Sequence, residues 1–151
     1  MSVSLKKGQG VSLSKSEYDL SQVTVGLGWD VREAKSGLLK SLFGKKDAEY
    51  DLDVIAFLCD ANGKVTNLGD IKQGKRTLLN GDIIFFNNLM HHSNHVWLTG
   101  DNRTGEGDGD DEVISVDITK VPENIEKVIF AVTIHEGQQN GQNFGQVDKA
   151  Y

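Results

Sequence analysis

The apolar residues of this chain fall in short runs rich in β-branched and aromatic side chains, and turn-forming residues separate the runs. Runs of this length and composition are typical of β-strands. Asn62-Gly63 and Asn80-Gly81 are dipeptides that close tight turns between strands. The runs expected to form strands are Val23–Trp29, Leu52–Cys59, Asp82–Phe86, His95–Gly100, Glu112–Ile118 and Lys127–His135. The pattern predicts an all-β fold, a β-sandwich of two mainly antiparallel sheets with long loops and little helix.

Two of these runs, Leu52–Cys59 and Lys127–His135, are apolar on both faces. A strand with two apolar faces is covered on both sides, so we expect both runs to form central strands. Val113–Val116 is only half apolar, and we expect it nearer an edge. Ser36–Lys46 is the main helix candidate. Its leucines favour a short surface helix or an insertion, and the lysines around them leave membrane contact as the alternative.

A chain of 151 residues is long enough to bury a core as a single domain, which we place at residues 1–151. The net charge of −6 and the isoelectric point near 5.1 argue against nucleic acid as a partner. The single cysteine, Cys59, excludes an internal disulfide, and its apolar strand favours a buried, inert thiol. Residues 1–10 lack the apolar stretch of a signal peptide, and no apolar run has the length of a membrane span. We therefore expect a cytoplasmic protein, with an oligomeric state that the sequence leaves open.

The segment Thr99–Glu112 concentrates acidic side chains between glycines. Residues 101–112 hold six carboxylates and one arginine, which sum to −5, so most of the net charge of −6 lies here. Like charges this close repel one another, and glycine adds backbone freedom that folding must remove. Such a loop is unfavourable unless it binds something. Calcium is a hard cation that takes about six to eight oxygen ligands from carboxylates, carbonyls and water.

The segment offers many oxygen ligands: Asp101, Asn102, Thr104, Glu106, Asp108, Asp110, Asp111 and Glu112. It contains neither histidine nor cysteine, which disfavours zinc. Its spacing does not fit a calcium-binding EF-hand, because Val113 falls where that loop needs a glutamate. Composition favours calcium, and a solvated acidic loop or a catalytic magnesium site remains open.

Three histidines and the two tryptophans are the other candidates for a binding site. His91, His92 and His95 lie in a polar stretch, for which we expect a solvated loop, with an incidental transition-metal site as the alternative. Trp29 and Trp97 are expected to belong to the core rather than to a binding platform.

Several motifs resemble, in order, the TerD family of tellurite-resistance proteins: "VGLGWD" (Val25–Asp30), "YDLDVIAFLCD" (Tyr50–Asp60), "GDIIFFNN" (Gly81–Asn88), "TGDNRTGEGDGDDE" (Thr99–Glu112) and "VISVDITKVPENIEKVIFAVTIH" (Val113–His135). The resemblance covers nearly the whole chain, and the acidic loop is its most specific motif. It implies a β-sandwich that binds calcium, with two ions expected, and that acts in bacterial defence against tellurite, phage and colicins without known enzymatic activity.

The resemblance also implies ligands outside the acidic loop. Asp60 and Asn87 are expected to help to close the calcium sites, and Asp30 is a further candidate. Asn88 is as easily explained by a turn hydrogen bond. Asp51 and Asp53 begin the strand that Asp60 ends, so only one of the two sets is expected to join the site.

The expected partners are other products of the tellurite-resistance operon, some of them membrane-bound, which implies a position peripheral to the inner membrane. Relatives continue for several more strands, so the resemblance implies that this chain is a short member or lacks a C-terminal part. A truncation would leave an open sheet edge near Lys127–His135. The resulting hypothesis is a calcium-binding module that is not an enzyme. The alternative is a Mg²⁺- or Mn²⁺-dependent hydrolase that uses the same carboxylates.

Overall fold

The computed structural model describes residues 21–29, 50–99 and 109–147, and these residues fold mainly into strands. In chain order, the elements are β1 (Gln22–Leu27), β2 (Leu52–Cys59), β3 (Ile71–Lys72), β4 (Lys75–Arg76), β5 (Ile83–Ile84), β6 (Val96–Thr99), β7 (Glu112–Asp117), β8 (Lys127–Ile134), α1 (Gly137–Asn140) and a 3-10 helix (Phe144–Gln146). The predicted all-β class with little helix is therefore confirmed.

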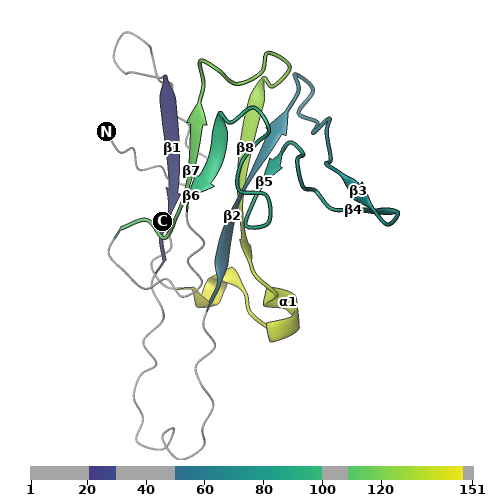
Figure 1. Ribbon diagram of the computed structural model, residues 1–151. Coiled ribbons are helices and arrows are strands. Elements are labelled where there is room, and N and C mark those ends of the chain that lie inside the picture. The colour runs from purple at the N-terminus through teal and green to yellow at the C-terminus, as the bar shows by residue number, and fades with distance from the viewer. Residues whose placement is uncertain (1–20, 30–49, 100–108, 148–151) are drawn as a thin grey trace, which may run out of the picture.

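The strands form two three-stranded sheets, of order β1-β7-β6 and β5-β2-β8, and a separate two-stranded hairpin of β3 and β4. All of the pairings are antiparallel. Figure 1 shows the two sheets side by side, with the β3–β4 hairpin projecting away from them. β3 and β4 are joined by a two-residue turn, Gln73-Gly74, whose positive φ angles of 52° and 74° suit a tight hairpin.

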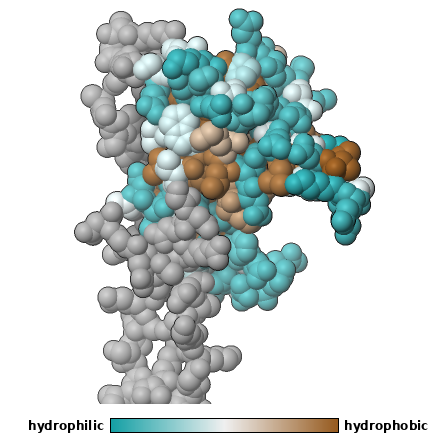
Figure 2. All heavy atoms as spheres, viewed as in Figure 1, coloured by the Kyte–Doolittle hydropathy of each residue, from teal (hydrophilic) through white to brown (hydrophobic). Residues whose placement is uncertain are grey.

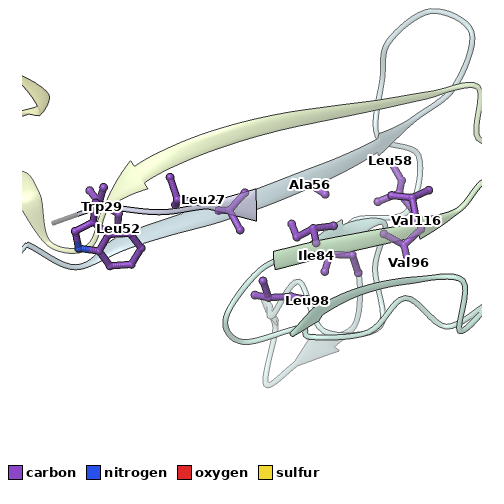
Figure 3. Packing of buried hydrophobic residues seen from close by; sticks show 11 residues of the cluster. Leu27, Trp29, Leu52, Ala56, Leu58, Ile84, Val96, Leu98 and Val116 are labelled. Carbon is purple, nitrogen blue, oxygen red and sulfur yellow. The ribbon is translucent and has the colours of Figure 1, made fainter. Parts of the chain in front are cut away.

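The core lies between the two sheets and is built from alternate residues of the strands. Figure 3 shows Trp29 and Leu52 together at one end of the core and Leu58 and Val116 towards the other. Trp29 is only 2% exposed, which confirms its predicted place in the core. Trp97 is half-buried and lies outside the core cluster, because it alternates with the buried Val96 and Leu98. The prediction that it is a core residue was therefore wrong.

The expected positions of two strands were also wrong, whereas the central place of β2 is confirmed. Among the strands of the described residues, β8 lies at the edge of its sheet, and Ile129 on it is 48% exposed. β7 is the central strand of its sheet, although it carries the buried polar residues Glu112 and Ser115. The Glu112 side chain accepts a hydrogen bond within the interior, so the apolar content of the run did not predict its burial.

The surface between β1, β7 and β8 contains a cavity of about 300 Å³, lined mainly by apolar residues such as Val23, Val116 and Val128. Figure 2 shows hydrophobic side chains in the middle of the face that it views, surrounded by polar ones. The polar residues that bear on function lie elsewhere, towards the two ends of the sheets.

Candidate metal centre

The antiparallel registers define two ends of the sandwich. Leu27 pairs with Glu112 in one sheet, and Leu52 pairs with Ile134 in the other. The hydrogen bond between Val54 and Glu112 joins the two sheets here, so the end of β1, the start of β2, the start of β7 and the end of β8 lie at the same end. We call this the carboxylate end, and it lies at the bottom of Figure 1. The opposite end contains Cys59, which pairs with Lys127, and the turn that follows it. We call it the hairpin end.

Glu112 joins the two sheets at the carboxylate end. Its side chain is fully buried, and its Oε2 accepts a hydrogen bond of 2.7 Å from the backbone N–H of Val54 in β2. The amide of Leu58, four residues further along β2, points to the same side and donates to the carbonyl of Asp82 next to β5. β5 pairs with Ala56 and Phe57 and does not extend to Val54. The Glu112 carboxylate therefore accepts the hydrogen bond from the Val54 amide that a neighbouring strand would otherwise accept.

Asp111 continues the pairing of β1 and β7 beyond Glu112. Its backbone N–H donates to the carbonyl of Leu27 at 2.8 Å, and its Oδ2 accepts from the backbone N–H of Trp29 at 2.9 Å. The indole Nε1 of Trp29 donates to the carbonyl of Tyr50 at 2.9 Å. These bonds attach the start of the acidic β7 segment to a tryptophan that is anchored in the core.

Asp110 lies against Gly26 of β1. A Cβ atom at position 26 would be 2.2 Å from Asp110 Oδ2 and 2.3 Å from its Cγ, so the carboxylate occupies space that any other residue would fill. The close approach of Asp110 therefore depends on the absence of a side chain at position 26, and not on backbone conformation, because the φ of Gly26 is not in the left-handed region. This is a cradle for a carboxylate at the carboxylate end.

Asp51 and Asp53 also lie at the carboxylate end, at the start of β2. Asp53 is 3% exposed, and its Oδ2 lies 3.4 Å from Nδ1 of His135, which follows β8. These aspartates were predicted as an alternative set to Asp60, and they, rather than Asp60, lie at the end shared with Asp110–Glu112. The hydrogen bond from Val54 to Glu112 is what joins the start of β2 to the start of β7, and no sequence spacing reveals it.

Asp60 lies at the hairpin end, after the last residue of β2. Its Oδ1 accepts hydrogen bonds from the backbone N–H groups of Asn62 and Lys64, both at 2.9 Å, so it caps the turn around Gly63. The hydrogen bond from Lys64 is the main reason that the pKa of Asp60 is lowered. The structure does not bring Asp60 to Asp110–Glu112, from which it is separated by roughly the length of β2.

Asn87 and Asn88 follow β5, which runs towards the start of β2. The ring of the neighbouring Phe86 makes an edge contact with His135, so Asn87 lies towards the carboxylate end and is exposed. Asn88 is buried, and its amide donates to the carbonyl of Ile83 at 2.7 Å. Asn88 therefore has the turn-stabilising role that was its alternative. The remaining predicted ligands lie outside the described residues: Asp30, Asp101, Asn102, Thr104, Glu106 and Asp108.

A second group of possible ligands lies at the hairpin end. Among the residues that the structure describes, one set of three side chains, Asp82, His91 and His92, has its donor atoms within 4.8 Å of one another. His91 is 1% exposed, and its Nε2 is 3.2 Å from Oδ1 of Asp82, which is 3% exposed. The expected solvated loop is therefore wrong for His91. His95 is partly exposed, and its Nδ1 lies 3.8 Å from Oδ2 of Asp117.

Burial of His91 gives a testable pH dependence. Desolvation lowers the pKa of its imidazole below the ordinary 6.5, with the nearby Asp82 opposing the shift. The unfolded chain binds the proton more readily than the folded protein, so the contribution of His91 to stability is complete above about pH 6.5 and is lost as pH falls through the folded pKa. We expect an NMR titration with a metal chelator present to show the His91 imidazole with a pKa below 6.5. A His91 resonance that titrates at or above 6.5 would contradict this.

Cys59 is buried, at 2% exposed, as predicted. Ser36–Lys46 lies outside the described residues. No helix in the described part of the chain is long and apolar enough to cross a membrane.

Comparison with known proteins places the chain in a family. A family model, the TerD domain, matches residues 1–151. The chain belongs to the TerD family. It is 62% identical to tellurium resistance protein TerX of Serratia marcescens over 151 residues, which cover 100% of this chain and 71% of the relative. It is 40% identical to general stress protein 16U of Bacillus subtilis over 151 residues, 67% of that relative.

A solved structure shares the fold of this TerD chain. It is the crystal structure of a homologue of telluride resistance protein TerD from Streptomyces coelicolor, with a TM-score of 0.59 and 21% identity. The match covers 86% of this chain and 62% of that one, so the present chain spans less than two thirds of its neighbour's length. The predicted resemblance to TerD is confirmed, and the relatives carry names for tellurium resistance and stress response.

Proposed function

We propose that this TerD chain is a calcium-binding module of tellurium resistance and stress response that acts through partner proteins and not as an enzyme. The observation that carries the proposal is the anchoring of Asp110, Asp111 and Glu112 at one end of the sandwich. Asp111 and Glu112 accept hydrogen bonds from the backbone N–H groups of Trp29 and Val54, and Asp110 lies against Gly26. Adjacent carboxylates held in this way repel one another unless a cation neutralises them.

The residues present fit calcium better than other cations. The carboxylate end offers oxygen donors, which a hard cation prefers, and the acidic segment that precedes Gly109 in the sequence supplies more. The three carboxylates of Asp110–Glu112 do not by themselves form a group of three donors within 4.8 Å, since the described residues contain such a group only at Asp82. The proposal therefore assigns further ligands to residues 101–108 and Asp30, and leaves Asp60 out.

Calcium, when bound, would supply the positive charge that lets this end of the sandwich adopt one arrangement. Binding energy would then appear as folding energy of the loops. The ordered surface would be what partner proteins recognise, including a membrane-associated complex of the resistance system. The names of the relatives support the biological setting, because TerX and TerD proteins are named for tellurium resistance.

Calorimetric titration of calcium into metal-free protein, with magnesium as a competitor, tests the proposal. We expect saturable binding of one or two ions and a rise in melting temperature. Asp110→Asn removes one ligand charge and should weaken binding by at least about tenfold, about 1.4 kcal/mol. Asp60→Asn is the matched control, because Asp60 lies at the hairpin end, and it should leave the affinity unchanged.

The possible outcomes separate the alternatives. Absence of calcium heat and of stabilisation would mean that the acidic loop is solvated. Preference for Mg²⁺ or Mn²⁺ over calcium, together with turnover of a phosphoester, would replace the proposal by the hydrolase alternative.

A further inference from the structure

Asp82, His91 and His92 form a cluster that the proposed calcium module does not use. Asp82 immediately precedes β5, and the two histidines lie in the turn that precedes β6. The backbone carbonyl of Asp82 accepts from Leu58, near the last residue of β2, which places the cluster at the hairpin end. Val54, which contacts Glu112, is four residues away from Leu58, about 13 Å along the strand. The cluster is therefore separate from the carboxylate end.

The Asp82 carboxylate is fixed by hydrogen bonds to one of its two oxygens. Oδ2 accepts from the backbone N–H of Asn67 at 3.0 Å and from the hydroxyl of Thr66 at 3.2 Å. The other oxygen, Oδ1, faces the ring of His91. Hydrogen bonds to the second oxygen of a ligating carboxylate are the usual support for a metal ligand, since they hold the first oxygen in position.

The ring of His91 is fixed in the same way. Its Nδ1 lies 2.7 Å from the hydroxyl of Ser93 and 3.3 Å from the backbone N–H of the same residue. The backbone N–H of His91 donates to the carbonyl of Val96 at 2.9 Å, which closes the turn. The second ring nitrogen, Nε2, is thereby directed at Asp82. Metal-binding imidazoles typically donate a hydrogen bond from the nitrogen that does not bind the metal. The hydroxyl of Ser93 can accept such a bond, whereas the longer bond, in which the Ser93 amide donates to Nδ1, belongs to the other tautomer of the ring.

The distance between the two facing atoms suits a shared ion. Asp82 Oδ1 and His91 Nε2 are 3.2 Å apart. Two ligands at zinc distances of about 2.0–2.1 Å in a tetrahedron are about 3.3 Å apart, so the ion could bind both with little movement of either side chain. The same separation also accommodates a direct hydrogen bond, which is the arrangement that an ion would replace.

His92 supplies a third donor from the surface. It is exposed, its ring centroid is 4.0 Å from that of His91, and its donor atom lies within 4.8 Å of the other two. A site with two buried ligands and one exposed ligand is open to ions from solvent. Three protein ligands also leave a coordination position for water, as in zinc sites that are not purely structural.

We propose that Asp82, His91 and His92 bind a borderline divalent transition-metal ion such as Zn²⁺, with water as a further ligand. Imidazole nitrogen suits such ions, whereas calcium takes oxygen ligands, so this site and the carboxylate end select different cations. On binding, the ion takes the place of the proton on His91 Nε2. The proton then moves to Nδ1, which donates to the hydroxyl of Ser93 and no longer accepts the 3.3 Å hydrogen bond from the Ser93 amide. The ion also links Asp82, which immediately precedes β5, to the turn before β6.

Titration of Zn²⁺ into calcium-saturated protein by calorimetry tests this proposal, because saturation with calcium occupies any oxygen-ligand site first. We expect one zinc ion per chain. His92→Gln removes an exposed ligand without disturbing the interior, and Asp82→Asn keeps the hydrogen bonds to Thr66 and Asn67 while removing the charge. Both should weaken zinc binding strongly, and Ser93→Ala should weaken it by about 10- to 100-fold.

His135→Gln is the matched control. His135 also lies beside a buried aspartate, Asp53 at 3.4 Å, but outside the cluster, and its loss should leave the affinity unchanged. Equal zinc binding by wild type, His92→Gln and His135→Gln would show adventitious surface binding and overturn the proposal, as would the absence of saturable binding to wild type. Absorption bands of tetrahedral Co²⁺ in wild type that disappear in His92→Gln would support it independently. None of these results depends on whether calcium binds the carboxylate end.

Discussion

Replacing Glu112 with alanine should lower the free energy of unfolding by about 3 kcal/mol. The carboxylate is fully buried and accepts the 2.7 Å hydrogen bond from the amide of Val54. The alanine variant leaves that amide without an acceptor in the interior and opens a cavity between the two sheets. Both effects act on β2 and β7, which are the central strands of their sheets.

Urea unfolding in the presence of a calcium chelator measures the effect without a contribution from ion binding. Fluorescence of the buried Trp29 reports the transition. Glu112→Gln keeps an acceptor oxygen for the Val54 amide and should retain most of the stability, which separates the hydrogen bond from the charge. Glu123→Ala is the control, since Glu123 is exposed. If Glu112→Ala destabilised the protein no more than Glu123→Ala, the link between the sheets would contribute little to folding.

The strands were predictable because they depend on local composition. Leu52–Cys59 was predicted with the bounds that β2 has, and Lys127–His135 exceeds β8 by one residue. Whether a strand is central or at the edge of its sheet was harder to predict from the sequence. β7 contains the buried polar residues Glu112 and Ser115, and Glu112 accepts a hydrogen bond from Val54 within the fold, whereas β8 keeps Ile129 exposed. Polarity along a sequence does not show whether a partner exists elsewhere in the chain.

For the candidate sites too, contacts between residues that are distant in the sequence could not be predicted. Composition predicted that Asp110, Asp111 and Glu112 belong together, and the register of β1 with β7 agrees. The separation of Asp60 from them follows from the direction and length of β2, which the resemblance alone did not convey. His91 was expected in solvent because its sequence neighbours are polar. Its buried partner Asp82 is nine residues away and reaches it only because the chain turns back after β5.

Replacing Gly26 with alanine should leave the metal-free protein nearly as stable as wild type and reduce calcium affinity by at least about tenfold. The new methyl group would lie within 2.7 Å of both oxygens of Asp110, so this carboxylate must rotate away. The side chain of Asp110 can move, and the backbone at position 26 has no positive φ that alanine would resist. Gly→Ala also reduces the conformational entropy of the unfolded chain, which favours folding by about 0.4–1 kcal/mol.

The comparison that decides this prediction is between Gly26→Ala and Thr24→Ala, an exposed change on the same strand. Calcium calorimetry and thermal unfolding should be measured on both in parallel. A loss of calcium affinity confined to Gly26→Ala, with both melting temperatures near wild type in chelator, would show that the position of Asp110 matters for the ion and not for the fold. Unchanged calcium affinity in Gly26→Ala would remove Asp110 from the ligand set. A large loss of stability without calcium would show instead that the Gly26–Asp110 contact serves the packing of β1 on β7.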